Sequence, residues 1–365
     1  MTVQNNSHER TAASVTSWLL DNGIAVSSPL EMTVITGGQS NLTYRLQDRE
    51  GRTFVLRRPP SGNVLETAHS MSREWRFLTA LHPTDVPVPT PIAACEDDAV
   101  IGAGFYVMEC VEGLVLHTAE DAAAIDAAAR RALTANLAQA MSQLHTVDVE
   151  SCGLSDIGRG EDYVARQLKR WQGQWDKTRS MANLDVGAID AAHHQLARDI
   201  PQQRSISVVH GDFRLGNAIA SEDGHVRAIL DWELATLGDP RADLGWLLLS
   251  WEEPGPPRVS NPTGVAPSTL TGFGSRAEFV AAYAASLGEE VSGEELNYFV
   301  AFAAWRWACI SAGVYARYEA GAMGGQEADL DAILRAVIDH AEYALDLLSR
   351  RADAAGAATH RAGAS

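Results

Sequence analysis

The 365-residue chain contains few cysteines and no excess of basic residues. Its four cysteines (Cys95, Cys110, Cys152 and Cys309) show no paired spacing, so we expect reduced thiols in a cytoplasmic protein rather than disulfides or a zinc site. Its 47 acidic residues outnumber its 29 basic residues, which gives a formal net charge of -18. This balance argues against nucleic acid or an anionic membrane as the main partner.

The sequence also lacks an evident leader segment and a long apolar run. Its start, Met1 to Arg10, is polar and contains no apolar stretch typical of a signal peptide. The most apolar helical candidate, Phe299–Tyr315, is interrupted by Arg306 and is too short to span a bilayer. We therefore expect no membrane partner, while a hydrophobic content of 46% is enough for a sizeable core.

Two short apolar runs stand out near the middle of the chain. Ile206–Val209 and Val226–Leu230 are each predicted to form a buried strand. The turn residues Ser221–Gly224 lie between the two runs and predict a hairpin-like return of the chain.

Three polar side chains that follow these runs suit phosphoryl transfer. Asp212 and Asn217 lie on the loop that leaves the first predicted strand, and Asp231 ends the second. A carboxylate such as Asp212 can orient an acceptor hydroxyl and accept its proton. The amide oxygen of Asn217 and the carboxylate of Asp231 are the oxygen ligands that magnesium prefers. We expect the three side chains to converge on one point.

The same residues resemble a known family. The spacing His-x-Asp-x-x-x-x-Asn over residues 210–217 resembles the kinase catalytic loop, and Asp231 takes the place of the metal-binding Asp of the Asp-Phe-Gly element. His210-Gly211-Asp212 replaces His-Arg-Asp, and Asp231-Trp232-Glu233 replaces Asp-Phe-Gly. With these replacements the chain resembles the aminoglycoside phosphotransferase family of small-molecule kinases.

The resemblance covers roughly residues 30–350, and three phrases narrow it. Gly-Gly-Gln-Ser-Asn, Val-Leu-Arg-Arg-Pro-Pro and Asp-Trp-Glu-Leu-Ala-Thr-Leu-Gly-Asp-Pro are similar to the kinase-like domains associated with some acyl-CoA dehydrogenases. The resemblance implies ATP and Mg2+ as cofactors and a small molecule with a hydroxyl group as the acceptor.

The resemblance also implies the fold class, an α+β protein-kinase-like bilobal fold with a small antiparallel β N-lobe and a mostly helical C-lobe. Strand-like runs near residues 32–35, 42–46, 53–58, 92–95 and 105–111 and a helical pattern at 69–81 fit the N-lobe. We expect an N-terminal helical extension (1–29), a nucleotide-binding N-lobe (30–113), a C-lobe with the catalytic loop and acceptor site (114–353) and a disordered tail (354–365).

A glycine-rich turn joins the first two predicted strands. In kinases such a turn covers the nucleotide phosphates with backbone N–H groups, and glycines permit the close approach. An ordinary tight hairpin is the alternative for this segment. The residues assigned to nucleotide binding here are Gly37, Gly38, Ser40 and Asn41.

The third predicted strand departs from the commonest family pattern. Arg57 stands where a Lys usually contacts the α- and β-phosphates, and Arg58 is the rival if the register differs by one residue. An arginine binds phosphate bidentately, so its geometry differs from that of a lysine. Glu74, on the predicted helix, is the expected ion-pair partner, with a solvated helix charge as the alternative.

The segment Phe105–Gly113 resembles the kinase hinge. By that resemblance the backbone of Glu109 and Val111 binds adenine and Met108 lines the back of the pocket, although Met108 also fits an ordinary core position.

The predicted C-lobe carries several further candidates. Asp239 and Asp243 match family positions that buttress the catalytic loop, and His145 fits a packing or capping role. Aromatic residues that could line an acceptor site, with plain core as the alternative, are Trp246, Trp251, Trp305, Trp307 and Tyr315.

The sequence thus predicts an ATP-dependent phosphotransferase that acts on a hydroxyl of a small molecule, either aminoglycoside-like or a hydroxy acid or hydroxyacyl compound. A nucleotide-binding pseudokinase module is the alternative, because Arg57 replaces the usual Lys. A metal-dependent hydrolase ranks lower because the sequence lacks the further His or carboxylate clusters of such a site. A protein kinase is disfavoured because no Ala-Pro-Glu element follows Asp231.

Overall fold

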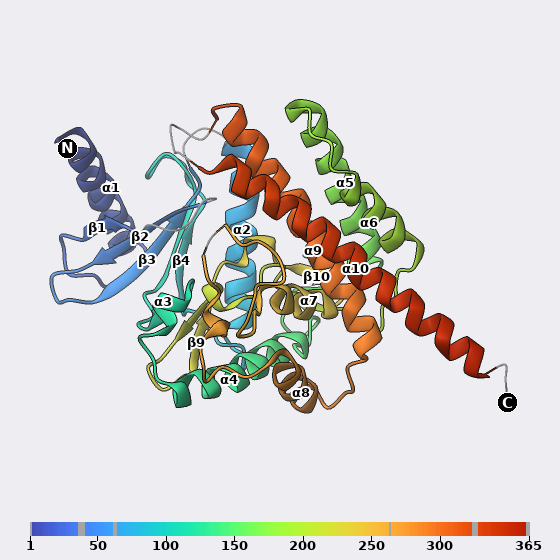
Figure 1. The fold of residues 1–365 in the computed structure, drawn as a ribbon. Coiled ribbons are helices and arrows are strands. Elements are labelled where there is room, and N and C mark those ends of the chain that lie inside the picture. The colour runs from blue at the N-terminus through green and yellow to red at the C-terminus, as the bar shows by residue number, and fades with distance from the viewer. Residues whose placement is uncertain (1, 36–40, 61–63, 263, 323–327, 363–365) are drawn as a thin grey trace. The chain divides into compact units, whose positions relative to one another are not determined.

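The computed structural model describes residues 2–35, 41–60, 64–262, 264–322 and 328–362, and Figure 1 shows the ribbon. The chain divides into two compact units. The first comprises residues 1–113 with the short segments 150–154 and 227–235, and the second comprises 114–149, 155–226 and 236–365.

The first unit is built on a five-stranded antiparallel sheet with the order β1-β2-β3-β5-β4. Each strand lies within two residues of its predicted bounds, so the antiparallel N-lobe sheet is confirmed. The strands are β1 (Glu31–Val34), β2 (Leu42–Gln47), β3 (Thr53–Arg58), β4 (Pro91–Cys95) and β5 (Phe105–Glu109).

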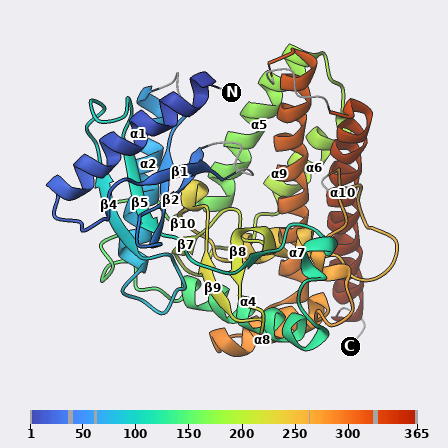
Figure 2. The ribbon, with the colours of Figure 1, turned by 90° about the vertical axis from the view of Figure 1, so that its left-hand side faces the viewer.

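The two faces of this sheet bury different helices, because side chains alternate along each strand. Helix α1 (Thr2–Asp21) packs Val15 and Leu19 against the face that carries Leu56 (Figure 2). Helix α2 (Val64–Leu81) packs Met71 and Leu78 against the opposite face, which carries Val55. Residue 57 shares the parity of residue 55, so β3 directs Arg57 to the α2 face.

The second unit is mostly helical, as expected. Helix α9 lies at its centre and packs against α10, α7, α5 and α6. Figure 1 shows α9 and α10 running alongside each other. The helices are α3 (Ala119–Ala122), α4 (Ala127–His145), α5 (Tyr163–Ala182), α6 (Gly187–Arg198), α7 (Arg241–Ser250), α8 (Arg276–Leu287), α9 (Gly293–Glu319) and α10 (Leu330–Ala362).

Helix α9 contains the apolar stretch Phe299–Tyr315 that stands out in the sequence. Its 27 residues make it the one helix, among the residues described, that passes a length and composition test for a membrane span. However, 78% of its apolar window is buried inside the structure, as in the core helix of a water-soluble domain.

The short strands near the catalytic loop pair differently from the prediction. β7 (Ser207–Val209) pairs antiparallel with β10 (Thr236–Gly238), not with the run at 226–230, which forms β9 (Val226–Ile229). β8 (Ala218–Ala220) precedes the 221–224 turn and pairs with β6 (Leu114–Val115). All of these runs are short and apolar, so their pattern identifies strands but does not specify partners.

The segment 119–145 forms two helices, and Asp126 caps the second, α4, by accepting a hydrogen bond from the Ala129 N–H at 2.8 Å. The end of the last helix differs from expectation. Helix α10 continues to Ala362, whereas a disordered tail was expected from residue 354. Its last turns are rich in alanine, the best helix former.

Candidate active site

The catalytic loop leaves β7 through a backbone turn that requires glycine. Gly211 has φ = +83°, a conformation that favours glycine over residues with a side chain. The glycine of His210-Gly211-Asp212 therefore suits this turn. The turn brings Asp212 out of a strand whose last residues, Val208 and Val209, are fully buried.

Three side chains donate hydrogen bonds to the Asp212 carboxylate. The indole Nε1 of Trp246 lies 2.7 Å from Oδ1. The amide Nδ2 of Asn217 lies 2.7 Å from Oδ2, and Arg214 Nε lies 3.3 Å from the same oxygen. The three donors therefore hold the carboxylate in one orientation.

Asn217 is oriented by the same contacts. Its Nδ2 donates both to the Asp212 backbone carbonyl at 2.8 Å and to Asp212 Oδ2. Both partners are acceptors, so the amide nitrogen must face Asp212 and the amide oxygen points the other way. That oxygen is of the kind that binds a hard cation.

Asp243 buttresses the catalytic loop, as the family resemblance implied. Its carboxylate accepts the backbone N–H of His210 at 2.6 Å and of Gly211 at 2.8 Å. Burial raises the pKa of Asp243, but hydrogen bonds from His145 and the loop backbone outweigh that effect and lower the pKa overall. Asp239, given the same role, instead binds the Arg241 Nε at 2.9 Å.

His145 has the packing role that was expected. It is buried, with Nδ1 2.8 Å from the Tyr283 hydroxyl and Nε2 3.3 Å from Asp243 Oδ2.

Arg306 is a functional candidate that sequence reasoning missed. It was noted only as a charge within an apolar helix, yet its Nη2 donates to the Gly211 carbonyl at 2.9 Å. Its guanidinium carbon lies 4.6 Å from the ring centroid of Trp246 and 5.4 Å from that of Trp171. A lone arginine on a buried helix face was the available signal, since such a charge needs partners.

Among the aromatic candidates, Trp246 is the one that contacts Asp212. Trp251 and Trp305 are fully buried, and their indole nitrogens donate to the carbonyls of Gly274 and Ile189. These two are core residues, the alternative that the sequence left open.

The first unit contains the other predicted cluster, around Arg57 and Glu74. The expected ion pair is present, with Arg57 Nη1 3.2 Å from Glu74 Oε2, and both side chains are buried. Arg58 lies on the opposite face and donates to the Ile101 carbonyl, so the register alternative is wrong. Glu74 also accepts hydrogen bonds from the Tyr106 hydroxyl at 2.8 Å and from Asn41 Nδ2 at 2.9 Å.

Burial dominates the electrostatics of Glu74. It raises the pKa of Glu74 to about 7, although Arg57 and the Tyr106 hydroxyl favour the ionised form. Glu74 thus gains or loses a proton close to neutral pH.

Arg57 also reaches Asp231. Its Nη2 lies 3.0 Å from Asp231 Oδ1. Asp231 has φ = +68°, which is uncommon for a residue other than glycine and is tolerated best by Asp and Asn. One guanidinium therefore joins the two carboxylates that the sequence assigned to phosphate positioning and metal binding.

The predicted hinge is partly engaged within the first unit. Met108 is buried in the cluster between β5 and α2, and the Glu109 N–H donates to the Thr90 carbonyl at 2.9 Å. The Glu109 N–H is therefore already engaged in a hydrogen bond within the first unit. Val111 follows β5 and is half-buried. Of the predicted glycine-rich turn, Gly37, Gly38 and Ser40 lie outside the described residues.

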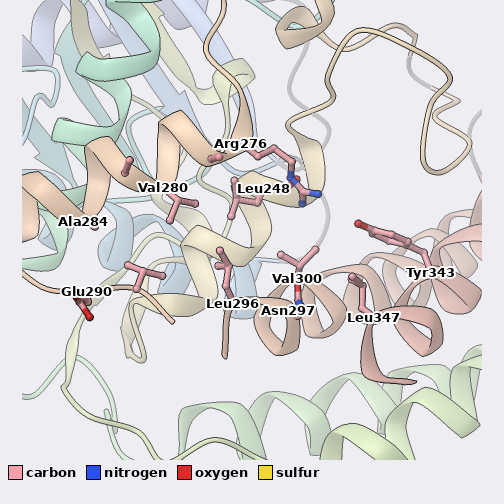
Figure 3. Close-up of a pocket in the computed structure, with 13 residues that line it drawn as sticks. Leu248, Arg276, Val280, Ala284, Glu290, Leu296, Asn297, Val300, Tyr343 and Leu347 are labelled. Carbon is pink, nitrogen blue, oxygen red and sulfur yellow. The ribbon is translucent and has the colours of Figure 1, made fainter. Parts of the chain in front are cut away.

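The described residues contain no group of three or more His, Cys, Asp or Glu side chains that could hold a metal. A cavity of about 510 Å³ between α7, α8, α9 and α10 is lined mainly by apolar side chains such as Leu248, Val280 and Val300, with Arg276 and Glu290 also on its walls (Figure 3). Leu248 follows Trp246 by two positions on α7, so the two side chains point to nearly opposite sides of the helix. The cavity is thus separate from the Asp212 site.

Comparison with known proteins identifies relatives of this chain. Acyl-CoA dehydrogenase family member 10 of Mus musculus is 34% identical over 298 residues, covering 81% of this chain and 27% of that protein. The chain spans between 27% and 38% of the length of such curated relatives.

Solved structures share the fold. A candidate aminoglycoside phosphotransferase from Ralstonia eutropha has a TM-score of 0.77 at 30% identity, with 93% of this chain and 98% of that chain covered. Choline kinase from Cryptosporidium parvum has a TM-score of 0.59 at 13% identity, covering 95% and 96%, which shows a common fold. The model of the phosphotransferase enzyme family matches residues 31–279, more than half of the chain, so this chain belongs to the phosphotransferase enzyme family.

Proposed function

We propose that this phosphotransferase transfers the γ-phosphoryl group of ATP to a hydroxyl of a small molecule. The observation that carries the proposal is the Asp212 carboxylate, which Trp246, Asn217 and Arg214 hold in one orientation. A carboxylate fixed in this way orients an acceptor hydroxyl and takes its proton as the new O–P bond forms.

The described residues fit magnesium and nucleotide phosphates. Asn217 turns its amide oxygen away from Asp212, and Asp231 is a carboxylate on a strained turn. One amide oxygen and one carboxylate suit magnesium, which usually takes its other ligands from water and substrate phosphates. Asn217 and Asp231 are the residues that would hold magnesium, and the bound ion would neutralise charge on the transferring phosphoryl group.

Arg57 fits the phosphate-binding role. Its Nε is buried without a hydrogen-bond partner among the described residues, while Nη1 and Nη2 pair with Glu74 and Asp231. A buried donor with no partner is costly, and a phosphate oxygen would satisfy it. We assign Glu74 and Asn41 to holding Arg57 and its surroundings, and the backbone of Glu109 and Val111 with Met108 to adenine.

The charges near Asp212 favour a hydroxy acid or hydroxyacyl compound over an aminoglycoside as acceptor. Arg214 contacts Asp212. The guanidinium carbons of Arg306 and Arg170 lie 5.4 Å and 5.2 Å from the ring centroid of Trp171. Basic groups attract a carboxylate and repel the ammonium groups of an aminoglycoside, so local charge outweighs the acidic whole.

A coupled assay of ADP release tests the proposal. The acceptor panel pairs hydroxy acids and hydroxyacyl thioesters with amino alcohols and aminoglycosides, and mass spectrometry follows the phosphorylated product. We expect ADP and product in equal amounts with at least one anionic acceptor. Turnover confined to cationic acceptors would contradict the acceptor class.

The alternative is a nucleotide-binding module without transferase activity, favoured by Arg57 in place of lysine. Calorimetry separates the two. ATP–magnesium binding with no ADP release from any acceptor in the panel would support the module and refute the transferase.

A further inference from the structure

We infer that Trp246 and Arg306 form a positioning pair that fixes the Asp212 carboxylate. Trp246 donates an indole hydrogen bond to Asp212, and the buried guanidinium of Arg306 lies over the face of the Trp246 ring. The kinetic part of the inference rests on the proposed function, whereas its structural part does not.

Trp246 controls one oxygen of Asp212. Its Nε1 donates to Oδ1 over a short distance of 2.7 Å. Asn217 and Arg214 both donate to Oδ2, so they constrain that oxygen. Loss of the indole N–H would leave Oδ1 without this donor. The carboxylate would then rotate more freely about the Cβ–Cγ bond.

Arg306 packs against the indole ring of Trp246. Its side chain is 5% exposed and its guanidinium carbon lies 4.6 Å from the Trp246 ring centroid. A cation over an indole face is worth more when desolvated, as this one is. The planar guanidinium therefore fixes the plane of the ring whose N–H points at Asp212.

Arg306 also ties that ring to the backbone of the catalytic loop. Its Nη2 donates to the Gly211 carbonyl at 2.9 Å, one residue before Asp212. The Gly211 N–H in turn donates a hydrogen bond to the Asp243 carboxylate. Arg306 thus contacts both the backbone next to Asp212 and the indole that binds the Asp212 side chain. Small displacements of a reacting group reduce reaction rates steeply.

The pair lies on two helices that the packing of Gly245 locks together. A Cβ at Gly245 would lie 2.4 Å from the Phe299 carbonyl oxygen, so α7 and α9 are in close backbone contact next to Trp246. This contact explains how residues 60 positions apart in sequence, 246 and 306, keep a fixed separation.

Indole NMR tests the structural part without any acceptor. The chain has nine tryptophans, and Trp246→Phe assigns the Trp246 resonance by its disappearance. In Asp212→Ala we expect the Trp246 Nε1–H resonance to move while that of Trp251, which donates to Gly274, stays in place. An unchanged Trp246 resonance would overturn the contact.

Kinetics test the positioning role. Trp246→Phe keeps an aromatic ring, although a smaller one, and removes the donor, so we expect kcat to fall by about 10- to 100-fold with the KM for ATP changed by less than about twofold. Trp251→Phe loses a comparable buried indole hydrogen bond away from Asp212 and should lower Tm with kcat unchanged. Equal kcat in Trp246→Phe and wild type would refute the role.

Arg306 provides the second arm. Arg306→Lys keeps a cation that can donate to Gly211 but lacks the planar face, so we expect an intermediate kcat, whereas Arg306→Met should fall as far as Trp246→Phe. In the double variant Trp246→Phe/Arg306→Met the losses should not multiply, because the two residues act through one contact. Fully multiplicative losses would contradict a positioning pair. A wild type that binds ATP yet phosphorylates nothing refutes the proposed function, and the indole spectra still decide the contact.

Discussion

At the residue scale, Arg57 and Glu74 form a buried ion pair that makes three further polar contacts. The pair sits on the α2 face of β3, receives hydrogen bonds from Tyr106 and Asn41, and reaches Asp231. A buried ion pair is weak evidence for stability by itself. Its contacts suit a phosphate-positioning role better than a purely structural one.

Substitution of Arg57 tests that role against a neighbour on the other face. Arg57→Met should weaken ATP binding by at least about tenfold, a loss of about 1.4 kcal/mol, because a charge-assisted phosphate contact disappears. Arg58→Met removes a guanidinium that donates to Ile101 and should leave ATP affinity within about twofold. Isothermal titration calorimetry compares the two variants, and equal losses would argue against Arg57 as the phosphate ligand.

Glu74 makes stability depend on pH near neutrality. Its folded-state pKa of about 7 lies above the ordinary 4.5, so the folded state holds a proton that the unfolded state has lost between these values. This contribution is complete below the unfolded pKa and is lost as the pH rises through 7. Relative to Glu74→Gln, the wild type should lose roughly 2 kcal/mol of unfolding free energy between pH 5.5 and 8. Urea unfolding of both proteins measures this difference, and parallel pH profiles would contradict it.

At the scale of elements, the close contact of α7 with α9 supports the catalytic loop. Gly245→Ala places a Cβ against the Phe299 backbone, which cannot yield as a flexible side chain would, so we expect a loss of about 1–3 kcal/mol. Gly173 lies within α5, and a methyl group added there would meet open space, so Gly173→Ala should be neutral or stabilising by up to about 1 kcal/mol. Thermal and urea unfolding of the two alanine variants check this contrast.

The elements themselves were largely predictable, and their pairing less so. Alternation and turn residues predicted the strands of the five-stranded sheet, and the order of elements predicted the partnership of Arg57 with Glu74. The partner of β7 was not predictable, because a three-residue apolar run fits several neighbours. Trp246 and Arg306 were not predictable as a pair because nothing in local spacing links them to Asp212.

At the scale of the whole molecule, a net charge of -18 coexists with basic side chains around Asp212. The net negative charge affects solubility and non-specific binding, whereas the basic groups near Asp212 affect which acceptor binds. The two statements apply at different distances, since salt screens charges beyond about 10 Å.

Removal of the divalent metal tests the phosphoryl-transfer chemistry at this scale. With excess EDTA, turnover should fall below detection and return on addition of magnesium, because charge on the transferring group is then neutralised again. Asn217→Ala should raise the magnesium concentration needed for half-maximal rate. Metal-independent ADP formation with product would contradict the assignment of Asn217 and Asp231 as ligands.

Asp212 is proposed to orient the acceptor hydroxyl and to accept its proton, and the Asp212→Ala variant separates that role from nucleotide binding. We expect ATP affinity by calorimetry within a few-fold of wild type, and formation of phosphorylated acceptor reduced by at least about 10³-fold. Substantial product formation by Asp212→Ala with the same acceptor, at an ATP affinity equal to wild type, would contradict this role of Asp212.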